Sequence, residues 1–238
     1  MGYTIVANWK MNGDIDFFNN YLNHFESYTP PQNTSVIIAP QAPLLSQNGC
    51  AIVKLAAQNM SQHASGAYTG EINAELLESM GIKYTILGHS ERRQYFYEEN
   101  REIQEKAIQA INHGIKPIIC IGESLKAYES EQTYRVLEKQ ILEAIPKTAK
   151  AEEFLIAYEP LWAIGTGKTP TISEIEAIHR FIAEKAKKHG AVSILYGGSV
   201  KPSNTQEILK QPHVHGVLVG GASLKPDDFM AIISSVPN

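Results

Sequence analysis

Short apolar segments rich in β-branched residues recur along the whole chain, and longer stretches with helical spacing of apolar positions separate them. Continuous apolar runs of this length are typical of strands that are buried on both faces, as in parallel sheets. The pattern therefore predicts eight strands, over residues 3–10, 35–40, 53–58, 83–90, 116–123, 153–160, 192–199 and 215–223.

Between these strands, helical periodicity is clearest in three segments: 101–114, 124–145 and 173–190. Ser124 is the expected N-cap of the second segment. In the third, Ser173 is the expected N-cap, acidic residues occupy the first turn, lysines occupy the last, and Gly190 ends the helix.

The alternation of strands and helices indicates repeated βα units. Eight such units in 238 residues fit a closed (β/α)8 barrel of the α/β class, and a doubly wound open sheet is the alternative. No proline- or serine-rich linker divides the chain, so we expect a single domain over residues 1–238.

In a barrel of this kind, functional residues lie at the carboxyl ends of the strands. The unusual polar and glycine residues fall there: Asn8 and Lys10 at the end of the first strand, His89 at the end of the fourth, Glu159 at the end of the sixth, Gly197-Gly198-Ser199 at the end of the seventh and Gly220-Gly221 at the end of the eighth. This clustering predicts a site at one rim of the barrel.

The segment Gly165–Thr169, with the sequence GTGKT, has to be tested as a nucleotide-binding loop. That motif needs a glycine five positions before its Gly-Lys-Thr, and Trp162 stands there. The preceding strand also ends in Glu159, a carboxylate at the point where a nucleotide phosphate would enter. Both features exclude a nucleotide P-loop.

Three glycine-rich loops, around Gly165, Gly197-Gly198 and Gly220-Gly221, would meet at the rim. One such loop alone is better explained as a tight strand-to-helix turn. Three loops on one rim favour a phosphate site, because backbone N–H groups in such loops bind an anion without basic side chains.

The ionisable side chains at this rim each have an ordinary explanation when taken singly. Lys10 could extend into solvent, and Glu91 could favour the start of a helix. His89 could be a hydrogen-bonded structural residue, and Glu159 a solvated carboxylate. Together they supply a base, an imidazole, a cation and an anion site, which suits proton abstraction beside the carbonyl of a phosphorylated substrate.

Composition and charge argue against a nucleic-acid-binding, secreted or membrane protein. The net charge is −4 with both signs interspersed, which argues against a nucleic-acid partner. Cys50 and Cys120 form no framework or metal-ligand pair and are expected to be reduced thiols. The N-terminal segment lacks signal-peptide features, and no apolar run approaches the roughly 20 residues of a membrane span. We therefore expect a soluble, cytoplasmic protein with no membrane partner.

Several motifs closely resemble the triosephosphate isomerase family, and together they cover the chain in order. They are ANWKMNG (7–13), GAYTGEI (66–72), GHSERR (88–93), CIGESL (120–125), AYEPLWAIGTGKT (157–169), YGGSVKPSN (196–204) and GVLVGGASL (216–224). The resemblance implies a TIM barrel that interconverts dihydroxyacetone phosphate and D-glyceraldehyde 3-phosphate through an enediolate, in glycolysis and gluconeogenesis. It implies no cofactor and no metal, because the substrate carbonyl itself acidifies the adjacent C–H bond.

The resemblance also implies a role for each rim residue. Glu159 would be the base that moves the proton between the two carbons, and His89 the electrophile that polarises the carbonyl. As in the family, His89 would be neutral, with its pKa lowered by the helix that SERR predicts to begin after it. Lys10 would hold developing negative charge with support from Asn8, and Glu91 would assist proton transfer beside Lys10.

By the same resemblance, the substrate phosphate would lie on the N–H groups of Gly165, Ser199, Gly220 and Gly221, and Asn8 and Lys10 would complete the substrate site. A lid would close over this site and exclude water. The lid residues are Leu161, Trp162, Ala163, Ile164, Gly165, Thr166, Gly167, Lys168 and Thr169.

One position departs from the family pattern. Pro170 stands where the family usually has an alanine, whose backbone N–H bonds to the tyrosine that matches Tyr196. Because proline has no N–H, we expect this latch to be absent. A contact from Ser199 to the Gly167 N–H would then carry more of the closure.

The resemblance also extends to a subunit interface. Thr69 resembles the residue that reaches into a partner subunit, and Glu71 and Arg93 resemble a cross-subunit ion pair. A homodimer with interdependent sites is therefore implied.

Two other functions are alternatives to that of a triosephosphate isomerase. Another phosphate-binding barrel enzyme would share the glycine-rich loops, and a non-catalytic binding protein could keep the scaffold. The combination of Glu159, His89 and Lys10 argues against the first. An inactive relative is expected to have lost one of these three residues or Asn8, and all four are present.

Overall fold

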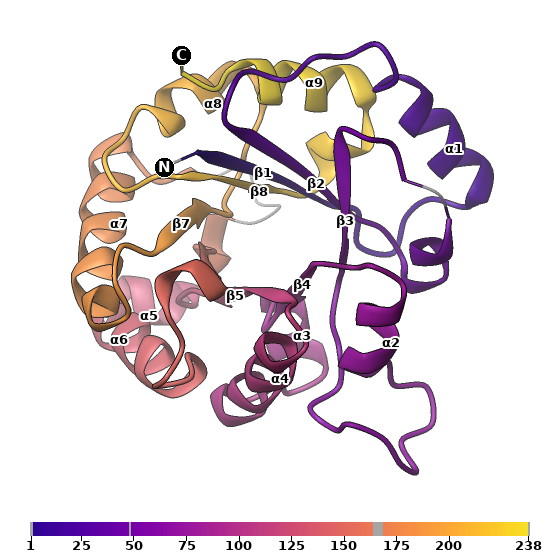
Figure 1. The fold of residues 1–238 in the computed structure, drawn as a ribbon. Helices are drawn as coiled ribbons and strands as arrows, with labels where there is room; N and C mark the ends of the chain where they lie inside the picture. Colours follow the sequence, from indigo (N-terminus) through magenta and orange to yellow (C-terminus); the bar gives the residue numbers. More distant parts are fainter. Residues whose placement is uncertain (1, 48, 164–168, 238) are drawn as a thin grey trace.

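The computed structural model of the chain describes residues 2–47, 49–163 and 169–237. Its centre is a closed barrel of eight parallel strands (Figure 1). The strands are β1 (Tyr3–Asn8), β2 (Thr34–Ala39), β3 (Val53–Ala57), β4 (Tyr84–Leu87), β5 (Lys116–Ile121), β6 (Leu155–Tyr158), β7 (Ser193–Tyr196) and β8 (Gly216–Val219). Because β8 pairs with β1, the predicted (β/α)8 barrel is confirmed and the open sheet is excluded.

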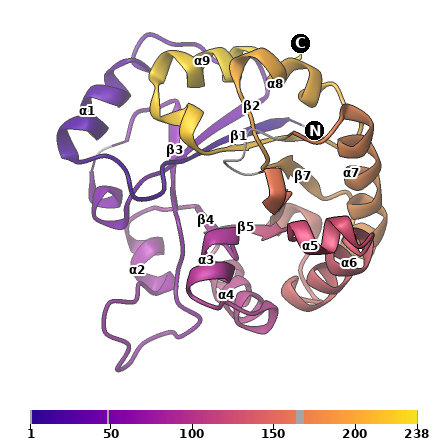
Figure 2. The ribbon, with the colours of Figure 1, turned by 180° about the vertical axis from the view of Figure 1, so that it is seen from behind.

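Helices surround the barrel, as the two opposite views of the ribbon show (Figure 1, Figure 2). The α-helices are α1 (Ile15–Asn23), α2 (Ala74–Ser79), α3 (Ser90–Tyr95), α4 (Asn100–Asn112), α5 (Leu125–Glu129), α6 (Thr133–Ala144), α7 (Ile172–Ala186), α8 (Pro202–Leu209) and α9 (Pro226–Ser234). Short 3₁₀ helices are η1 (Ala42–Ser46), η2 (Ala151–Glu153), η3 (Leu161–Ala163), η4 (Lys187–His189) and η5 (Gly221–Leu224). Among the described residues, no helix is long and apolar enough to span a bilayer.

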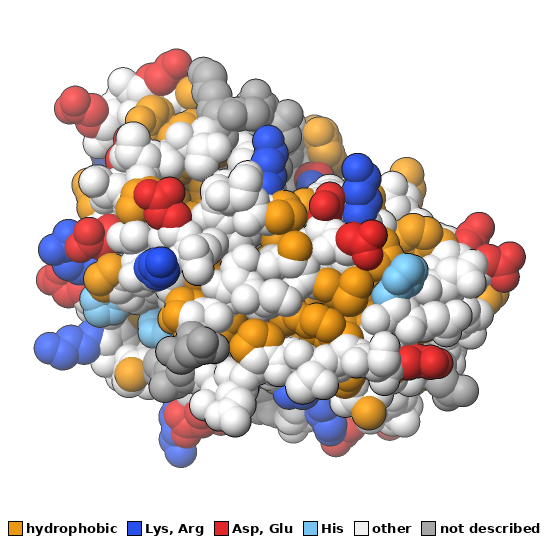
Figure 3. Space-filling view, turned by 90° about the horizontal axis from the view of Figure 1, so that it is seen from above, with side chains coloured by type: hydrophobic (Ala, Val, Ile, Leu, Met, Phe, Trp, Pro, Cys, Tyr) orange, Lys and Arg blue, Asp and Glu red, His pale blue; other side chains and the backbone are white. Residues whose placement is uncertain are grey.

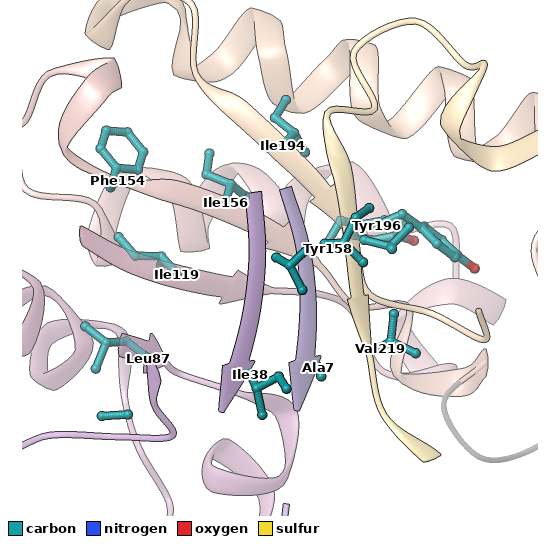
Figure 4. Close-up of a cluster of buried hydrophobic side chains, with 14 of the residues drawn as sticks. Ala7, Ile38, Leu87, Ile119, Phe154, Ile156, Tyr158, Ile194, Tyr196 and Val219 are labelled. Atoms are coloured by element: carbon teal, nitrogen blue, oxygen red, sulfur yellow. The ribbon is translucent and has the colours of Figure 1, made fainter. Parts of the chain in front are cut away.

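The strands send alternate side chains into two separate cores. Inside the barrel, Cys120 on β5 lies opposite Ala157 on β6, and both are fully buried. Between the strands and the helices, Ile119, Ile156 and Ile194 form a row across β5, β6 and β7 (Figure 4). Because both faces of these strands are buried, the sequence shows continuous apolar runs.

Two helix boundaries differ from the prediction. The segment 124–145 is not one helix, because the chain turns at Glu131 with φ +56° and divides it into α5 and α6. A glutamate rarely adopts this left-handed conformation, and no glycine marks the break. Ser173 is not the N-cap of α7, because Thr171 caps that helix in a reciprocal capping box with Glu174.

Other predicted boundaries are confirmed or nearly so. Ser124 caps α5 by accepting the backbone N–H of Ala127 at 3.2 Å. Gly190, with φ +104°, ends the short 3₁₀ turn that follows α7. The strands end earlier than the apolar runs predicted, so Lys10 and His89 lie in the loops just beyond them. These loops form the carboxyl-terminal rim of the barrel.

Candidate active site

The carboxyl ends of the strands surround a cavity of about 250 Å³. Its lining includes Asn8, Lys10, His89, Glu159, Ser199, Gly220 and Gly221, all of them predicted from the sequence, together with Gly197, Gly198, Val200, Lys201, Leu218 and Ala222. These residues follow strands that are distant in sequence. Closure of the barrel therefore brings the predicted side chains to one place.

Glu159 follows β6, and its backbone N–H donates to the Ile121 carbonyl at 2.7 Å. The residue is only 3% exposed. Its Oε1 lies 3.0 Å from Nε2 of His89, and its Oε2 accepts the backbone N–H of Ser90 at 3.0 Å. Burial raises the pKa of Glu159, but His89, the Ser90 N–H and Lys10 lower it by more, so the pKa is below its ordinary value.

His89 is the N-cap of α3, which begins where the sequence predicted. Its Nδ1 accepts the backbone N–H of Glu91 at 3.3 Å, so the ring proton is left on Nε2, the atom that faces Glu159. Burial lowers the pKa of His89, the Glu159 carboxylate raises it, and the net shift is upward. The expected lowering of this pKa is therefore wrong for the present arrangement, because the carboxylate outweighs burial.

Lys10 lies two residues beyond β1 with φ +53°, a conformation that few non-glycine residues adopt. Its backbone is held on both sides, since Asn8 Oδ1 accepts its N–H at 3.1 Å and Gln58 donates to its carbonyl at 2.8 Å. Its ammonium lies 2.6 Å from Oε1 of Glu91, whose side chain is 40% exposed. These contacts hold a cation at the wall of the cavity.

The loops after β7 and β8 line another part of the cavity. A Cβ added to Gly198 would lie 2.2 Å from the Tyr196 hydroxyl oxygen, so this close approach requires glycine. Gly220 precedes the η5 turn, and open space lies beside the Cα of Gly221. Backbone N–H groups that are not covered by side chains suit an anion.

Only part of the predicted lid can be placed. Ile164, Gly165, Thr166, Gly167 and Lys168 lie outside the described residues, so the contacts expected of Gly165 and Gly167 stay predictions. Leu161–Ala163 form η3, and Thr169 is exposed. The hydroxyl of Ser199 donates to the Ala163 carbonyl at 2.7 Å, which ties the base of this segment to the cavity lining.

The expected absence of a latch between Tyr196 and residue 170 stays a prediction. The Tyr196 hydroxyl is buried and has no hydrogen-bond partner in the described part of the chain. Leaving a buried polar group unpaired costs stability. Pro170 has no N–H to satisfy it.

Glu123 lies at the rim, and no role was predicted for it. It is fully buried two residues after β5, and its Oε1 accepts the Tyr158 hydroxyl at 3.1 Å and the Trp162 indole N–H at 2.8 Å. Burial raises its pKa against these donors. Its position in the CIGESL motif, at the end of a predicted strand, was the available signal, but its partners lie on another strand and in the lid.

Of the residues expected at a subunit interface, Thr69 and Glu71 lie on one loop, and Arg93 lies on α3. Thr69 and Glu71 are exposed in the loop before α2. Arg93 donates within the chain to the Gly88 carbonyl at 2.8 Å, to Asn100 Oδ1 at 2.7 Å and to the carbonyl of Cys120 at 2.9 Å. The cross-subunit pair of Glu71 and Arg93 stays a prediction.

Charges of both signs are interspersed over the face of the molecule in Figure 3. Within residues 2–47, 49–163 and 169–237, no group of three or more His, Cys, Asp and Glu side chains is placed to hold a metal ion.

A sequence model of the triosephosphate isomerase family matches residues 3–236. A triosephosphate isomerase of Alkaliphilus oremlandii is 43% identical over 97% of this chain and 98% of its own length. Those of Mesomycoplasma hyorhinis and Magnetococcus marinus are 40% and 41% identical, over 97% and 98% of this chain and 97% of their own lengths.

Proposed function

The chain belongs to the triosephosphate isomerase family, and from that premise we propose a role for each residue of the cavity. The protein is an isomerase of triose phosphates, which places it in glycolysis. It interconverts dihydroxyacetone phosphate and D-glyceraldehyde 3-phosphate. The observation that carries the assignment of roles is the pairing of the Glu159 carboxylate with Nε2 of His89 at 3.0 Å inside the cavity.

Glu159 is the base in this proposal. Its lowered pKa keeps the carboxylate ionised at neutral pH, as proton abstraction from carbon requires. In the ligand-free arrangement it is held by His89 and by the Ser90 N–H, so it must leave these partners to reach a substrate carbon. Burial then strengthens its basicity, because the cavity offers it little water.

His89 and Lys10 stabilise the charge that develops on the substrate oxygens. Nε2 of His89 is the ring atom directed into the cavity, because Nδ1 accepts the Glu91 N–H. Once Glu159 turns to the substrate, its carboxylate raises the pKa of His89 less, and burial lowers this pKa against the Glu91 carboxylate, which favours a neutral ring as hydrogen-bond donor. Lys10 supplies the cation, and Asn8 positions the Lys10 backbone.

The phosphate group binds at the loops after β7 and β8. Gly220, Gly221 and Ser199 line the cavity there and contribute backbone N–H groups, and Gly165 would add another from the lid. Leu161–Thr169 close over the bound substrate and exclude water, which suppresses loss of phosphate from the enediolate. Glu91 supports proton transfer through its contact with Lys10.

The protein works as a cytoplasmic homodimer in this proposal. Thr69 and Glu71 are exposed on the loop before α2, where a second subunit could receive them, and Arg93 is the expected partner of Glu71. Gel filtration with light scattering measures the mass in solution. A monomer of about 26 kDa with ordinary activity would contradict the dimer.

A coupled isomerase assay on glyceraldehyde 3-phosphate tests the function. We expect strong turnover by the wild type and a loss of about 10³-fold or more in Glu159→Gln, checked for folding by circular dichroism. A folded wild-type protein without turnover would contradict the isomerase assignment. Turnover that survives in Glu159→Gln would instead remove Glu159 as the base.

A further inference from the structure

The turn that follows β8 is held by two buried hydroxyl groups. Ser223, fully buried in η5, has its hydroxyl oxygen 2.7 Å from the Gly220 carbonyl and 3.2 Å from that of Val219. Its backbone N–H donates to the same Gly220 carbonyl at 2.9 Å. The Ser223 carbonyl in turn accepts the hydroxyl of Tyr21 at 2.7 Å. Because Tyr21 belongs to α1, this contact joins the beginning of the chain to the turn after its last strand.

The sequence explains why a side chain supplies the donor to the Ser223 carbonyl. In a 3₁₀ helix each carbonyl accepts the N–H of the third residue after it. For Ser223 that residue is Pro226, which has no N–H. The Tyr21 hydroxyl donates instead, and burial raises the pKa of its phenol, so the proton stays on the oxygen. A buried carbonyl without a partner would cost free energy.

The ring that carries this hydroxyl is packed on several sides. Tyr21 is 2% exposed, and its ring centroid lies 4.7 Å from that of Trp9 and 5.7 Å from that of Phe25. Trp9 stands between Asn8 and Lys10 in the sequence. Because side chains packed at interior density keep one position, the hydroxyl is a fixed donor.

The turn that Tyr21 supports belongs to the wall of the cavity. Gly220 and Gly221 both line it. A Cβ added to Gly220 would lie 3.6 Å from Cε of Lys10, so the turn passes beside the cationic side chain. The direction of the Gly220 and Gly221 N–H groups follows from the backbone of the turn, whose carbonyls are held by the Ser223 and Tyr21 hydroxyls.

We propose that Tyr21 is a positioning residue for the substrate phosphate, because its hydroxyl fixes the turn 220–224 in the form that presents the N–H groups of Gly220 and Gly221. The described lining of the cavity does not include Tyr21, so its effect passes through the Ser223 carbonyl. Without this hydroxyl, binding has to order the turn as well, and the affinity for phosphate falls. The inference rests on the proposed function, since it names what holds the phosphate site of that reaction.

The test uses Tyr21→Phe, which keeps the ring and removes the hydroxyl. With glyceraldehyde 3-phosphate, we expect kcat/KM to fall by about 5-fold, chiefly through KM. Inhibition by inorganic phosphate should weaken by the same factor, because this ion occupies the proposed phosphate site alone. D-glyceraldehyde lacks the phosphate group, so kcat/KM for its isomerisation, followed by ¹H NMR, should change by less than about 2-fold.

The two substrates separate this role from a merely structural one. A general loss of packing at the cavity would lower kcat/KM equally for both. Equal losses, or unchanged kinetics and unchanged inhibition by phosphate, would overturn the proposal. Tyr21→Met also lacks the hydroxyl and gives the same test if the phenylalanine variant does not fold. A folded wild type without turnover of glyceraldehyde 3-phosphate would instead contradict the proposed function.

Tyr28→Phe is the matched control. The Tyr28 hydroxyl lies 3.3 Å from the Met230 carbonyl and 2.8 Å from Oγ of Ser234, both on α9, so it also joins the beginning of the chain to its end. These three residues are not among the described residues that line the cavity. We expect all three measurements to stay within about 1.5-fold of the wild type. Weaker inhibition by phosphate in Tyr28→Phe, equal to that in Tyr21→Phe, would contradict a specific role for Tyr21.

Discussion

Two buried glutamates lie at the rim, after neighbouring strands, and they differ in what faces them. Glu159, after β6, is 3% exposed, and Glu123, after β5, is fully buried. The Glu159 carboxylate faces an ionisable ring, that of His89, at 3.0 Å. The Glu123 carboxylate faces two neutral donors, the Tyr158 hydroxyl and the Trp162 indole.

Their pKa values therefore shift in opposite directions. Burial raises both, but His89, the Ser90 N–H and Lys10 reverse the shift of Glu159, and the two donors to Glu123 do not reverse its shift. Burial alone does not determine whether a carboxylate is ionised and can accept a proton. The charge of its partners separates a carboxylate that is ionised for proton transfer from one that holds neighbouring groups in place.

Among the substitutions that test this contrast, we expect Lys10→Met to lower kcat/KM the most. The change removes a cation that lowers the pKa of Glu159 and that would stabilise negative charge on the substrate oxygens. We expect kcat/KM to fall by about 10²- to 10³-fold, with Glu91 left unpaired at a half-exposed position. Steady-state kinetics with the folded variant measure this. A loss under about 3-fold would mean that the ammonium is a surface charge.

Shortening each glutamate by one methylene compares the two sites directly. We expect Glu159→Asp to lower kcat by about 10²-fold, because a displacement of about 1 Å misplaces the base. Glu123→Asp should lower kcat by less than about 5-fold and act mainly on stability, since that carboxylate touches no substrate. Equal losses of kcat in the two variants would remove the distinction between them.

The pattern of the sequence predicted Glu159 and not Glu123, for a physical reason. A base, an imidazole and a cation follow three different strands. Because the carboxyl ends of parallel strands meet at one rim, the sequence already indicates that these three groups lie close together. The role of Glu123 depends on Tyr158 and Trp162, and such pairings become visible only when side chains are packed. The general chemistry of the rim was therefore predictable, whereas its supporting hydrogen bonds were not.

Two helix boundaries were predicted wrongly for the same reason, because they depend on contacts that residue type does not show. Ser173 and Thr171 are both good N-caps by residue type, and the choice between them rests on the reciprocal bond of Thr171 with Glu174. Glu131 breaks the 124–145 segment although nothing in its residue type favours φ +56°. The barrel was predictable because burial on both faces makes whole strands apolar, and such runs are visible in the sequence. A helix boundary depends on a single residue and its contacts.

Stability should depend on pH with opposite signs at the two glutamates. The lowered pKa of Glu159 adds stability above its unfolded value near 4.5, and this is lost as pH falls through the folded pKa. The raised pKa of Glu123 adds stability below 4.5, and this is lost as pH rises through the folded pKa.

Urea unfolding of Glu159→Gln, Glu123→Gln and the wild type between about pH 3.5 and 6 measures this difference. The stability advantage of wild type over Glu159→Gln should grow with pH, and that over Glu123→Gln should shrink. Slopes of the same sign would contradict the contrast.

The smallest effect is expected from Tyr158→Phe. This change removes one of the two donors to Glu123 and leaves the chemistry of Glu159 in place. We expect a loss of about 1 to 2 kcal/mol in the free energy of unfolding and a change in kcat below about 2-fold. Urea unfolding and the isomerase assay check both values. A loss of kcat near that of Glu159→Asp would assign Glu123 to the chemistry.

Hydrogen exchange at the substrate carbon tests most directly that Glu159, and not Glu123, moves the proton. Dihydroxyacetone phosphate is incubated in D₂O with wild type, Glu159→Gln or Glu123→Gln, and ¹H NMR follows the loss of its carbon-bound hydrogen. We expect exchange with the wild type and with Glu123→Gln. With folded Glu159→Gln, we expect exchange to be slower by about 10³-fold or more. Exchange by Glu159→Gln at the wild-type rate would contradict its role as the base.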